Sequence, residues 1–319
     1  MLDGSAEACF GSDMNEFHTE LLLHGVERAR ETADSRQNRR LVEVAAEILA
    51  EGADRIGISH AGFALTGLPH KETREPVWRR EGYNILLLVE SGRNRRGTTV
   101  GIPFGSKARM ILLYLQTQAI RTQSREVELG PSMRAWMGAL GVGTTGGMTY
   151  KLVIKQAQRI AACRLTFFTR RDDLELRQNG AFVDSEVSLF GGSEGRQGLL
   201  WQERVTLNEH FYRSLQAHPV PIREAALRCI GGSSLAIDVY IWLAYRLHSL
   251  KRPITISWPA IHAQFGAGFK VMRQVKPTFV EALRLALAVY PEAKVEVDPA
   301  VGLTLHPSRP PVSPLTRLG

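Results

Sequence analysis

The stretch 106–171 constrains the fold more than any other part of the chain, because its pattern changes repeatedly between helix and strand. Apolar residues recur at helical spacing from Ile111 through Leu115 to Ala119, which predicts a first helix. Residues 125–129, Arg-Glu-Val-Glu-Leu, then alternate between polar and apolar as a short strand does. A helix is therefore followed directly by a strand.

A second and a third helix are expected after this strand. Gly130-Pro131 predicts the start of the second helix, since proline fits the first helical position, and Gly141 predicts its end. The glycine-rich GVGTTGG turns the chain into a third helix at 149–162, and strands are expected at 164–169 and 181–190. This order is typical of a winged helix, in which the third helix lies in the DNA major groove.

The charge of the third helix favours the same interpretation. Lys151, Lys155, Gln158 and Arg159 are expected on one face, opposite the apolar residues. The range 129–171 holds seven basic residues and no acidic one. A surface helix usually mixes both signs, whereas a field of one sign attracts polyanions. A solvated basic face without a ligand is the alternative.

A second unit of the same pattern is expected in the C-terminal half. It would consist of a helix at 234–248, a strand at 253–257, a helix opening at Trp258-Pro259, a helix at 277–290 and a hairpin of 294–297 with 303–305. The range 239–280 again contains no Asp or Glu, and Lys270, Arg273 and Lys276 lie close to the start of the long helix, where free N–H groups favour phosphate.

The sequence therefore predicts an α+β protein, mainly α, with two tandem winged-helix domains. The expected organisation is a mobile tail at 1–35 with a short helix near 17–30, a first domain at 36–197, a second at 198–307 and a C-terminal tail at 308–319. A length of 319 residues with 44% hydrophobic residues suits two such domains. The net charge of +8 favours nucleic acid or another anionic surface as the partner.

The hydrophobic runs, the first residues and the cysteines indicate where in the cell the protein is expected. No apolar run reaches the length of a membrane span, and the polar start MLDGSAEACF is unlike a signal peptide. Cys9, Cys163 and Cys229 are odd in number and far apart, which indicates neither a disulfide framework nor a zinc site. A bacterial-type cytoplasm is expected.

Catalytic interpretations find little support. A phosphate-binding loop requires Lys-Ser/Thr after its last glycine, but Met148-Thr149 follows GVGTTGG. A DNA-nicking enzyme requires a His-x-His metal pair with a catalytic tyrosine, and no such pair occurs. Asp172-Asp173 with Glu175 is more typical of solvated charges in a loop than of a metal site. We expect no catalytic residues, no metal and no cofactor, and thus no enzyme.

Several segments in fixed order carry a family resemblance. They include LPHK at 68–71, WRREG at 78–82, VGIPFGSKARMILLYLQTQAIRTQSREVELGPS at 100–132, LGVGTTGG at 140–147, LLWQERVTLNEHFYRSL at 199–215, HAQFGAGF at 262–269 and GLTLHPSRPPV at 302–312. Together they resemble the plasmid-encoded replication initiators of the RepA type from proteobacterial plasmids. The resemblance extends from about residue 40 to residue 312.

This resemblance implies a specific function. Initiators of this kind bind direct repeats (iterons) at a plasmid origin through two winged helices, help to melt AT-rich DNA, and recruit host DnaA and the DnaB helicase. Their dimers often repress their own gene, while the monomers start replication. The family offers no catalytic residues to transfer.

The predicted function is therefore iteron binding on double-stranded DNA by a replication initiator. The residues expected to read or contact DNA are Thr144, Thr145, Tyr150, Lys151, Lys155, Arg159, Arg170 and Arg171 in the first unit, and Lys270, Arg273, Gln274 and Lys276 in the second. Two alternatives stay open: a winged-helix transcriptional repressor without a role in replication, and an initiator enzyme that nicks DNA or hydrolyses nucleotides.

Overall fold

The computed structural model describes residues 16–51, 55–94, 96–142, 146–171, 174–184, 190–191, 200–201, 203–268 and 271–312. The fold is mixed α/β, and the chain forms two compact units. Unit 1 comprises Met1–Ile56, Pro221–Ile230 and Leu235–Gly319, and unit 2 comprises Gly57–Val220 and Gly231–Ser234. The two units thus divide the chain differently from the predicted ranges 36–197 and 198–307.

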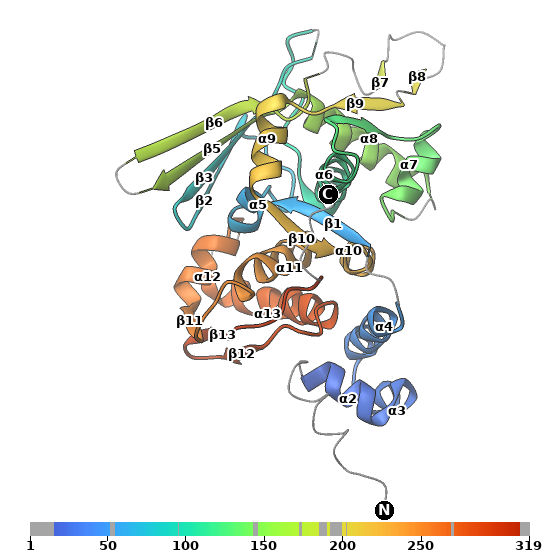
Figure 1. Ribbon diagram of the computed structural model, residues 1–319, viewed down its shortest axis with the longest axis vertical. Coiled ribbons are helices and arrows are strands. Elements are labelled where there is room, and N and C mark those ends of the chain that lie inside the picture. Colours follow the sequence, from blue (N-terminus) through green and yellow to red (C-terminus); the bar gives the residue numbers. More distant parts are fainter. Residues whose placement is uncertain are drawn as a thin grey trace, which may run out of the picture. The chain divides into compact units, whose positions relative to one another are not determined.

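Unit 2 is built on a four-stranded antiparallel sheet with the order β2-β3-β5-β6 (Figure 1). Its strands are β2 (Val77–Gly82), β3 (Ile85–Glu90), β5 (Arg164–Arg171) and β6 (Leu174–Ala181). Its helices are α5 (Ala61–Leu65), α6 (Gly105–Arg121), α7 (Met133–Ala139), α8 (Gly147–Ala162) and α9 (Glu209–Ala217). Two short strands, β4 (Glu126–Glu128) and β9 (Arg204–Thr206), pair with each other, as do β7 (Phe190–Gly191) and β8 (Leu200–Trp201).

Helix α6 forms much of the core of unit 2. Ile111, Leu115 and Ala119 are fully buried, as their spacing predicted. Arg109 is also buried, because its guanidinium donates to the main-chain carbonyls of Leu68, Pro69 and Gly105. A buried charge requires such partners, and these bonds fix the segment before α6 against the helix.

Helix α7 begins and ends through two local signals. Ser132 caps its N-terminus by accepting a hydrogen bond from the Ala135 N–H. Pro131 therefore lies before the cap, and the prediction that it occupies the first helical position was wrong. Gly141 follows the helix with a φ of 65°, and Val142 N–H returns to the Met137 carbonyl. The left-handed conformation favours glycine at this position, so the predicted end of the helix is confirmed.

The strand that follows β5 differs from the prediction. The sequence predicted a strand at 181–190, but β5 turns directly into β6, with Arg171 paired to Leu174 and Arg164 to Ala181. Phe182 and Val183, beyond β6, are instead buried in the core. The prediction was wrong because an edge strand pairs through its main chain, which requires no apolar alternation in its sequence.

Unit 1 contains a three-stranded sheet next to a group of helices. The helices are α2 (Glu16–His24), α3 (Val26–Thr32), α4 (Arg36–Ala50), α10 (Glu224–Ile230), α11 (Ser234–Leu247), α12 (Trp258–Phe265) and α13 (Met272–Ala288). The sheet has the order β11-β13-β12, from β11 (Ile254–Ser257), β12 (Val295–Asp298) and β13 (Gly302–Leu305). The strands β1 (Ile56–His60) and β10 (Pro219–Arg223) form a further pair, and the boundary between the units falls within each of them.

Helix α13 starts earlier than predicted. The sequence placed its start at Pro277, but the helix begins at Met272 and includes the proline. Val275 and Phe279 are fully buried. Proline removes one main-chain hydrogen bond, and the burial of these apolar side chains offsets that loss. The predicted basic approach to the helix is therefore in part its first turn.

Part of the predicted N-terminal tail is also packed. Of the range 1–35, the structure describes residues 16–35, and α2 and α3 account for most of them. Leu21 and His18 are buried, and His18 Nε2 lies 3.0 Å from the carbonyl oxygen of Ala288 in α13. Burial lowers the pKa of His18 to about 4, so the neutral ring donates to this carbonyl at neutral pH.

Candidate nucleic-acid interface

Helix α8 presents its first turns to solvent. Tyr150 and Lys151 are exposed, and the side chain of Met148 is 73% exposed. The opposite face of the helix is buried through Val153 and Ile160. The structure therefore places Tyr150 and Lys151 on an accessible turn, as the sequence predicted.

The later turns of α8 are anchored by an acidic residue that the local sequence did not reveal. Lys155 Nζ lies 2.9 Å from Glu72 Oε1, and the guanidinium of Arg159 donates to the same carboxylate. Arg159 Nη1 also donates to the main-chain oxygen of Ile102 at 3.0 Å. Arg159 is only 6% exposed, so it does not share the exposed face predicted for Lys151, Lys155 and Gln158.

The physical reason for this difference lies in the position of Arg159 on the helix. At 100° per residue, Arg159 lies between the exposed side of α8, which bears Lys151, and the buried side, which bears Gln156 and Ala157. A long side chain at such a boundary can turn either way. The carboxylate of Glu72 and the free carbonyl of Ile102 draw the guanidinium inward.

An aromatic ring completes this cluster. Phe104 lies with its ring centroid 5.1 Å from the Arg159 guanidinium carbon and 6.0 Å from Lys155 Nζ. The main-chain N–H of Phe104 donates to Gln156 Oε1 of α8 at 2.8 Å. At Gly101, which has a φ of 99°, an added Cβ would lie 2.8 Å from the Arg159 guanidinium. The segment before α6 is thus fitted closely to α8.

The ion pairs change the electrostatics of the helix. Hydrogen bonds from Lys155 and then from Arg159 hold the pKa of Glu72 below its usual value. Glu72 is therefore a carboxylate at neutral pH and neutralises part of the charge of α8. Within the described part of the chain Lys151 forms no ion pair, so the unneutralised positive charge of this helix lies near Lys151.

The start of α13 is the matching feature of unit 1. Arg273 and Gln274 are exposed in its first turn. Lys276 is half-buried, because its ammonium lies 5.1 Å from the ring centroid of Trp258 and donates to the Pro299 carbonyl at 3.1 Å. Arg273 and Gln274 are thus on an accessible surface as predicted, whereas Lys276 connects α13 to the β12–β13 turn.

The β12–β13 turn is ordered by contacts on both sides. Trp258 Nε1 donates to the carbonyls of Asp298 and Pro299 at 3.0 and 3.1 Å. Asp298 Oδ1 accepts from the N–H groups of Val301 and Ala300, which lowers the pKa of this carboxyl. The turn therefore has a fixed position beside the start of α13.

Other predicted DNA-contacting residues are described only in part. Thr144, Thr145 and Lys270 lie outside the described residues. Arg170 and Arg171 belong to β5, where their main chains pair with Glu175 and Leu174 of β6. They therefore lie at the end of the strand that follows α8, next to the turn of the β5–β6 hairpin.

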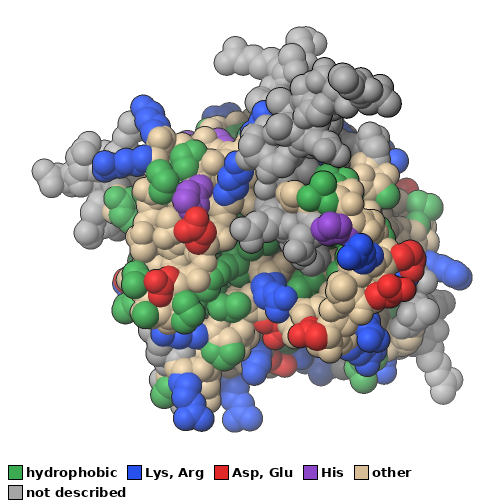
Figure 2. Space-filling model, turned by 90° about the horizontal axis from the view of Figure 1, so that it is seen from below, with side chains coloured by type: hydrophobic (Ala, Val, Ile, Leu, Met, Phe, Trp, Pro, Cys, Tyr) green, Lys and Arg blue, Asp and Glu red, His purple; other side chains and the backbone are tan. Residues whose placement is uncertain are grey.

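Surface charge alone does not identify one binding face. Figure 2 shows a face on which Lys and Arg side chains alternate with Asp and Glu side chains and with hydrophobic ones. The distinction between paired and unpaired basic residues, for example Lys155 and Lys151, therefore carries more information than their number. Glu72, Phe104, Ile102 and Pro299 were missed by sequence reasoning, because no local pattern connects them to α8 or α13.

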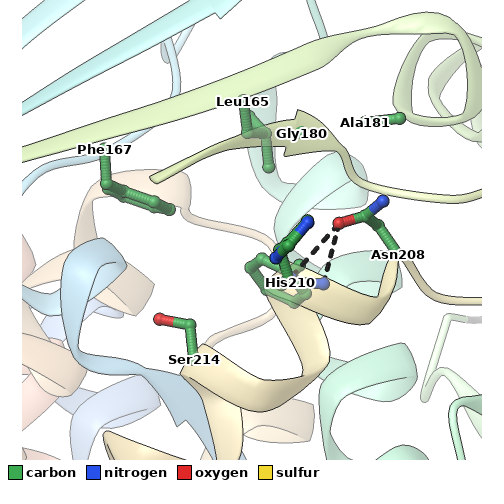
Figure 3. A pocket seen from close by; sticks show the side chains of 8 residues that line it. Leu165, Phe167, Gly180, Ala181, Asn208, His210 and Ser214 are labelled. Carbon is green, nitrogen blue, oxygen red and sulfur yellow. Dashed lines mark hydrogen bonds between the residues drawn. The ribbon is translucent and has the colours of Figure 1, made fainter. Parts of the chain in front are cut away.

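A small pocket in unit 2 lies beside helix α9. It is lined by Leu165, Phe167, Gly180, Ala181, Asn208, His210, Phe211 and Ser214 (Figure 3). The Asn208 side chain turns back to the main-chain N–H groups of His210 and Phe211 and caps α9. The Ser214 hydroxyl lies 2.8 Å from His60 Nε2. The side chains of Asn208 and Ser214 are therefore engaged within the fold.

His60 itself belongs to the core. Its Nδ1 accepts from the Gly62 N–H, so Nε2 carries the proton that is donated to Ser214. Burial and the neighbouring His218 lower the pKa of His60 to about 3. Within the described part of the chain, no group of three or more His, Cys, Asp or Glu is arranged to hold a metal ion. None of the helices described there is long and apolar enough to span a bilayer.

Comparison with known families identifies the class of protein. Residues 102–259 match the model of the family described as "Plasmid encoded RepA protein". This stretch spans about half of the chain and includes α6, α7 and α8, whereas Glu72, which pairs with α8, precedes it. The chain belongs to this family of plasmid replication proteins, and the resemblance derived from the sequence is confirmed.

Solved structures provide a comparison of the fold. A crystal structure of domains 2 and 3 of RctB, as selenomethionine derivatives, has a TM-score of 0.50 and 11% identity, and it covers 80% of this chain and 99% of that one. A second structure of RctB domains 2–3 has a TM-score of 0.44 and 10% identity, with coverage of 76% and 93%. The first supports the mixed α/β architecture, and at this identity the likeness concerns the fold alone. No curated protein matches the chain.

Proposed function

We propose that this protein is a plasmid replication initiator that binds direct repeats (iterons) at its origin through the first turns of α8 and α13. The observation that carries the proposal is the accessible basic or polar turn that opens each helix, with Tyr150 and Lys151 in unit 2 and Arg273 and Gln274 in unit 1. Arginine and lysine suit guanine edges, and glutamine suits adenine.

The topology of unit 1 supports a winged helix as the DNA-binding element. Its elements follow the order α11, β11, α12, α13, β12, β13, and β11 joins the hairpin to give the sheet β11-β13-β12. Unit 2 has the corresponding order from α6 to β6, but β4 pairs with β9 and not with the β5–β6 hairpin. We propose two tandem winged helices, of which the one in unit 2 is a variant.

The remaining steps are extensions of this proposal. Phosphate contacts by Arg170, Arg171, Lys270 and other basic residues would supply affinity, and Thr144 and Thr145 would contact bases. The bound initiator would help to open AT-rich DNA and recruit host DnaA and a DnaB-type helicase in the cytoplasm. Its dimers would repress their own gene. We propose no catalytic step, because the described pocket and side chains offer no catalytic constellation.

The test is binding to a duplex that carries the direct repeats flanking this gene, compared with a scrambled duplex, over a series of salt concentrations. We expect a tight complex with the repeats only, and an affinity that falls steeply with salt. Lys151→Met and Arg273→Met should each reduce the preference for the repeats. Arg79→Met is the control, because Arg79 is exposed but already paired with Glu81.

Equal and weak binding to both duplexes would refute the proposal. Replication is tested separately, by asking whether the gene maintains a plasmid that carries the repeats. Binding without maintenance would indicate a transcriptional repressor. Metal-dependent nicking of supercoiled plasmid, or turnover of ATP, would indicate an enzyme and contradict the absence of a catalytic step.

A further inference from the structure

We propose that the exposed arginines at the start of α4 form a second contact with the DNA backbone in unit 1, beside the C-terminal half of α13. This inference rests on the proposed function, since it assumes that α13 binds DNA. The surface consists of Arg36, Arg39 and Arg40 of α4 together with Arg284 of α13, and we call it the α4 arginine surface.

The three arginines of α4 have no partner within the described part of unit 1. Their side chains are exposed, and none donates a hydrogen bond or forms an ion pair there. The nearby acidic groups are engaged elsewhere. Glu43 pairs with Arg30 at 3.1 Å, and Asp34 accepts a hydrogen bond from the Asn38 side chain. The positive charge of this surface is therefore available to a ligand.

The stability of α4 does not explain these arginines. The helix docks through a buried face formed by Leu41, Ala45 and Ile48, and the Ser35 hydroxyl caps its N-terminus. Arg36 is the first residue of the helix, where a positive charge opposes the helix dipole. The first turn of α4 holds no acidic residue to compensate. The placement of Arg36 is thus unfavourable for the helix, and the free N-terminal end of α4 favours an external anion.

The packing of α4 places this surface along α13. Arg284 Nη2 donates to Asn38 Oδ1 at 2.8 Å, which joins the exposed side of α13 to the first turn of α4. Arg284 follows Arg273 by 11 residues (284 − 273) in one continuous helix, which corresponds to about 16 Å along its axis at about 1.5 Å per residue. The DNA major groove is about 12 Å wide. A helix whose first turn touches bases therefore leaves the groove before Arg284.

Phosphates lie where the helix leaves the groove. In homeodomains the end of the recognition helix contacts the DNA backbone in this way. Glu281, which is exposed one turn before Arg284, would repel a phosphate there. The arginines of α4 extend the positive surface beyond that carboxylate. This chemistry recognises the phosphate backbone of duplex DNA and not its base sequence.

The test uses the full chain and the triple variant Arg36→Gln, Arg39→Gln, Arg40→Gln. The measurement is the slope of log affinity against log salt, on the repeat duplex and on the scrambled duplex. Each lost phosphate contact reduces the slope by about 0.9. When salt rises from about 50 to about 200 mM, the wild-type protein should lose roughly 40-fold more affinity than the triple variant, if all three contacts are removed. We expect this flatter salt dependence with an unchanged ratio between the two duplexes.

Two further variants separate local charge from other effects. The variant Arg79→Gln, Arg204→Gln, Arg213→Gln makes the same change of net charge, from +8 to +5, but removes exposed arginines that are paired with Glu81, Glu128 and Glu209. It should keep the wild-type slope. Replacing the three α4 arginines by lysine should restore most of the slope, because the charge is retained.

A wild-type slope in the α4 glutamine variant would overturn the inference, as would an equal reduction of the slope in the paired-arginine control. Failure of the wild-type protein to prefer the repeats would instead refute the proposed function. Even then, the slopes on either duplex would still decide whether the α4 arginine surface contacts DNA. Thermal unfolding of the variants checks the fold, and we expect no loss of stability because the three replaced side chains are exposed and have no partner in the described part of unit 1.

Discussion

The substitution Arg159→Met separates a structural role of this residue from the DNA-reading role that the sequence suggested. The change removes the donor to the Ile102 carbonyl and to Glu72, while methionine retains most of the apolar stem. A buried carbonyl without a donor costs about 1–3 kcal/mol. The ion pair adds at most about 1 kcal/mol, because the Glu72 side chain is 48% exposed and can be hydrated. We expect the free energy of unfolding to fall by about 2–3 kcal/mol.

The assay is urea denaturation followed by circular dichroism, together with thermal unfolding. For a unit of this size, the expected loss corresponds to a decrease in Tm of about 4–12 °C. Lys151→Met is the matched control, because it also replaces a basic residue of α8 by methionine, but at an exposed position. It should change the stability by less than about 0.5 kcal/mol and weaken the preference for the repeat duplex.

The opposite pattern would refute this reasoning. If Arg159→Met unfolded at the wild-type urea concentration and lost its preference for the repeats, Arg159 would be a DNA-contacting residue. Its contacts with Glu72 and Ile102 would then carry little free energy, and the surface predicted from the sequence would be the correct one.

Three further predictions concern stability. Burial lowers the pKa of His60 to about 3 from the ordinary 6.5, so between these pH values only the unfolded state binds a proton at this histidine. Lowering the pH from 7 to 5 should therefore reduce the free energy of unfolding by about 2 kcal/mol. In His60→Gln the urea midpoint should depend less on pH. Gly302→Ala should destabilise unit 1 by at least about 2 kcal/mol, measured by urea denaturation, because Gly302 has a φ of 151° and an added Cβ would lie 2.0 Å from the Ile256 carbonyl of β11. Tyr290→Phe should cost about 1–2 kcal/mol and speed proteolysis of the C-terminal segment, because the hydroxyl donates to the Arg309 carbonyl at 2.7 Å. A pH profile unchanged in His60→Gln, a wild-type midpoint in Gly302→Ala, or unchanged proteolysis in Tyr290→Phe would contradict the respective prediction.

Features governed by neighbouring residues could be predicted from the sequence. Met133, Trp136 and Met137 recur at helical spacing and are the buried residues of α7, and glycine at position 141 marked the end of that helix. The helix expected at 149–162 is α8, Gly147–Ala162. Helical periodicity and a left-handed glycine act within a few residues, so these predictions required no knowledge of distant segments. The family resemblance rested on the same local stretches.

The sequence by itself thus determined the helices α6, α7 and α8, the apolar residues that α6 buries, and the family resemblance. Only the tertiary structure decided the role of Arg159, whose acidic partner Glu72 is 87 residues away, and the pairing of β4 with β9. The physical reason is common to both. Main-chain hydrogen bonds and ion pairs can be formed by any segments of suitable type, so their partners are selected when the core packs and not by the local pattern of residues.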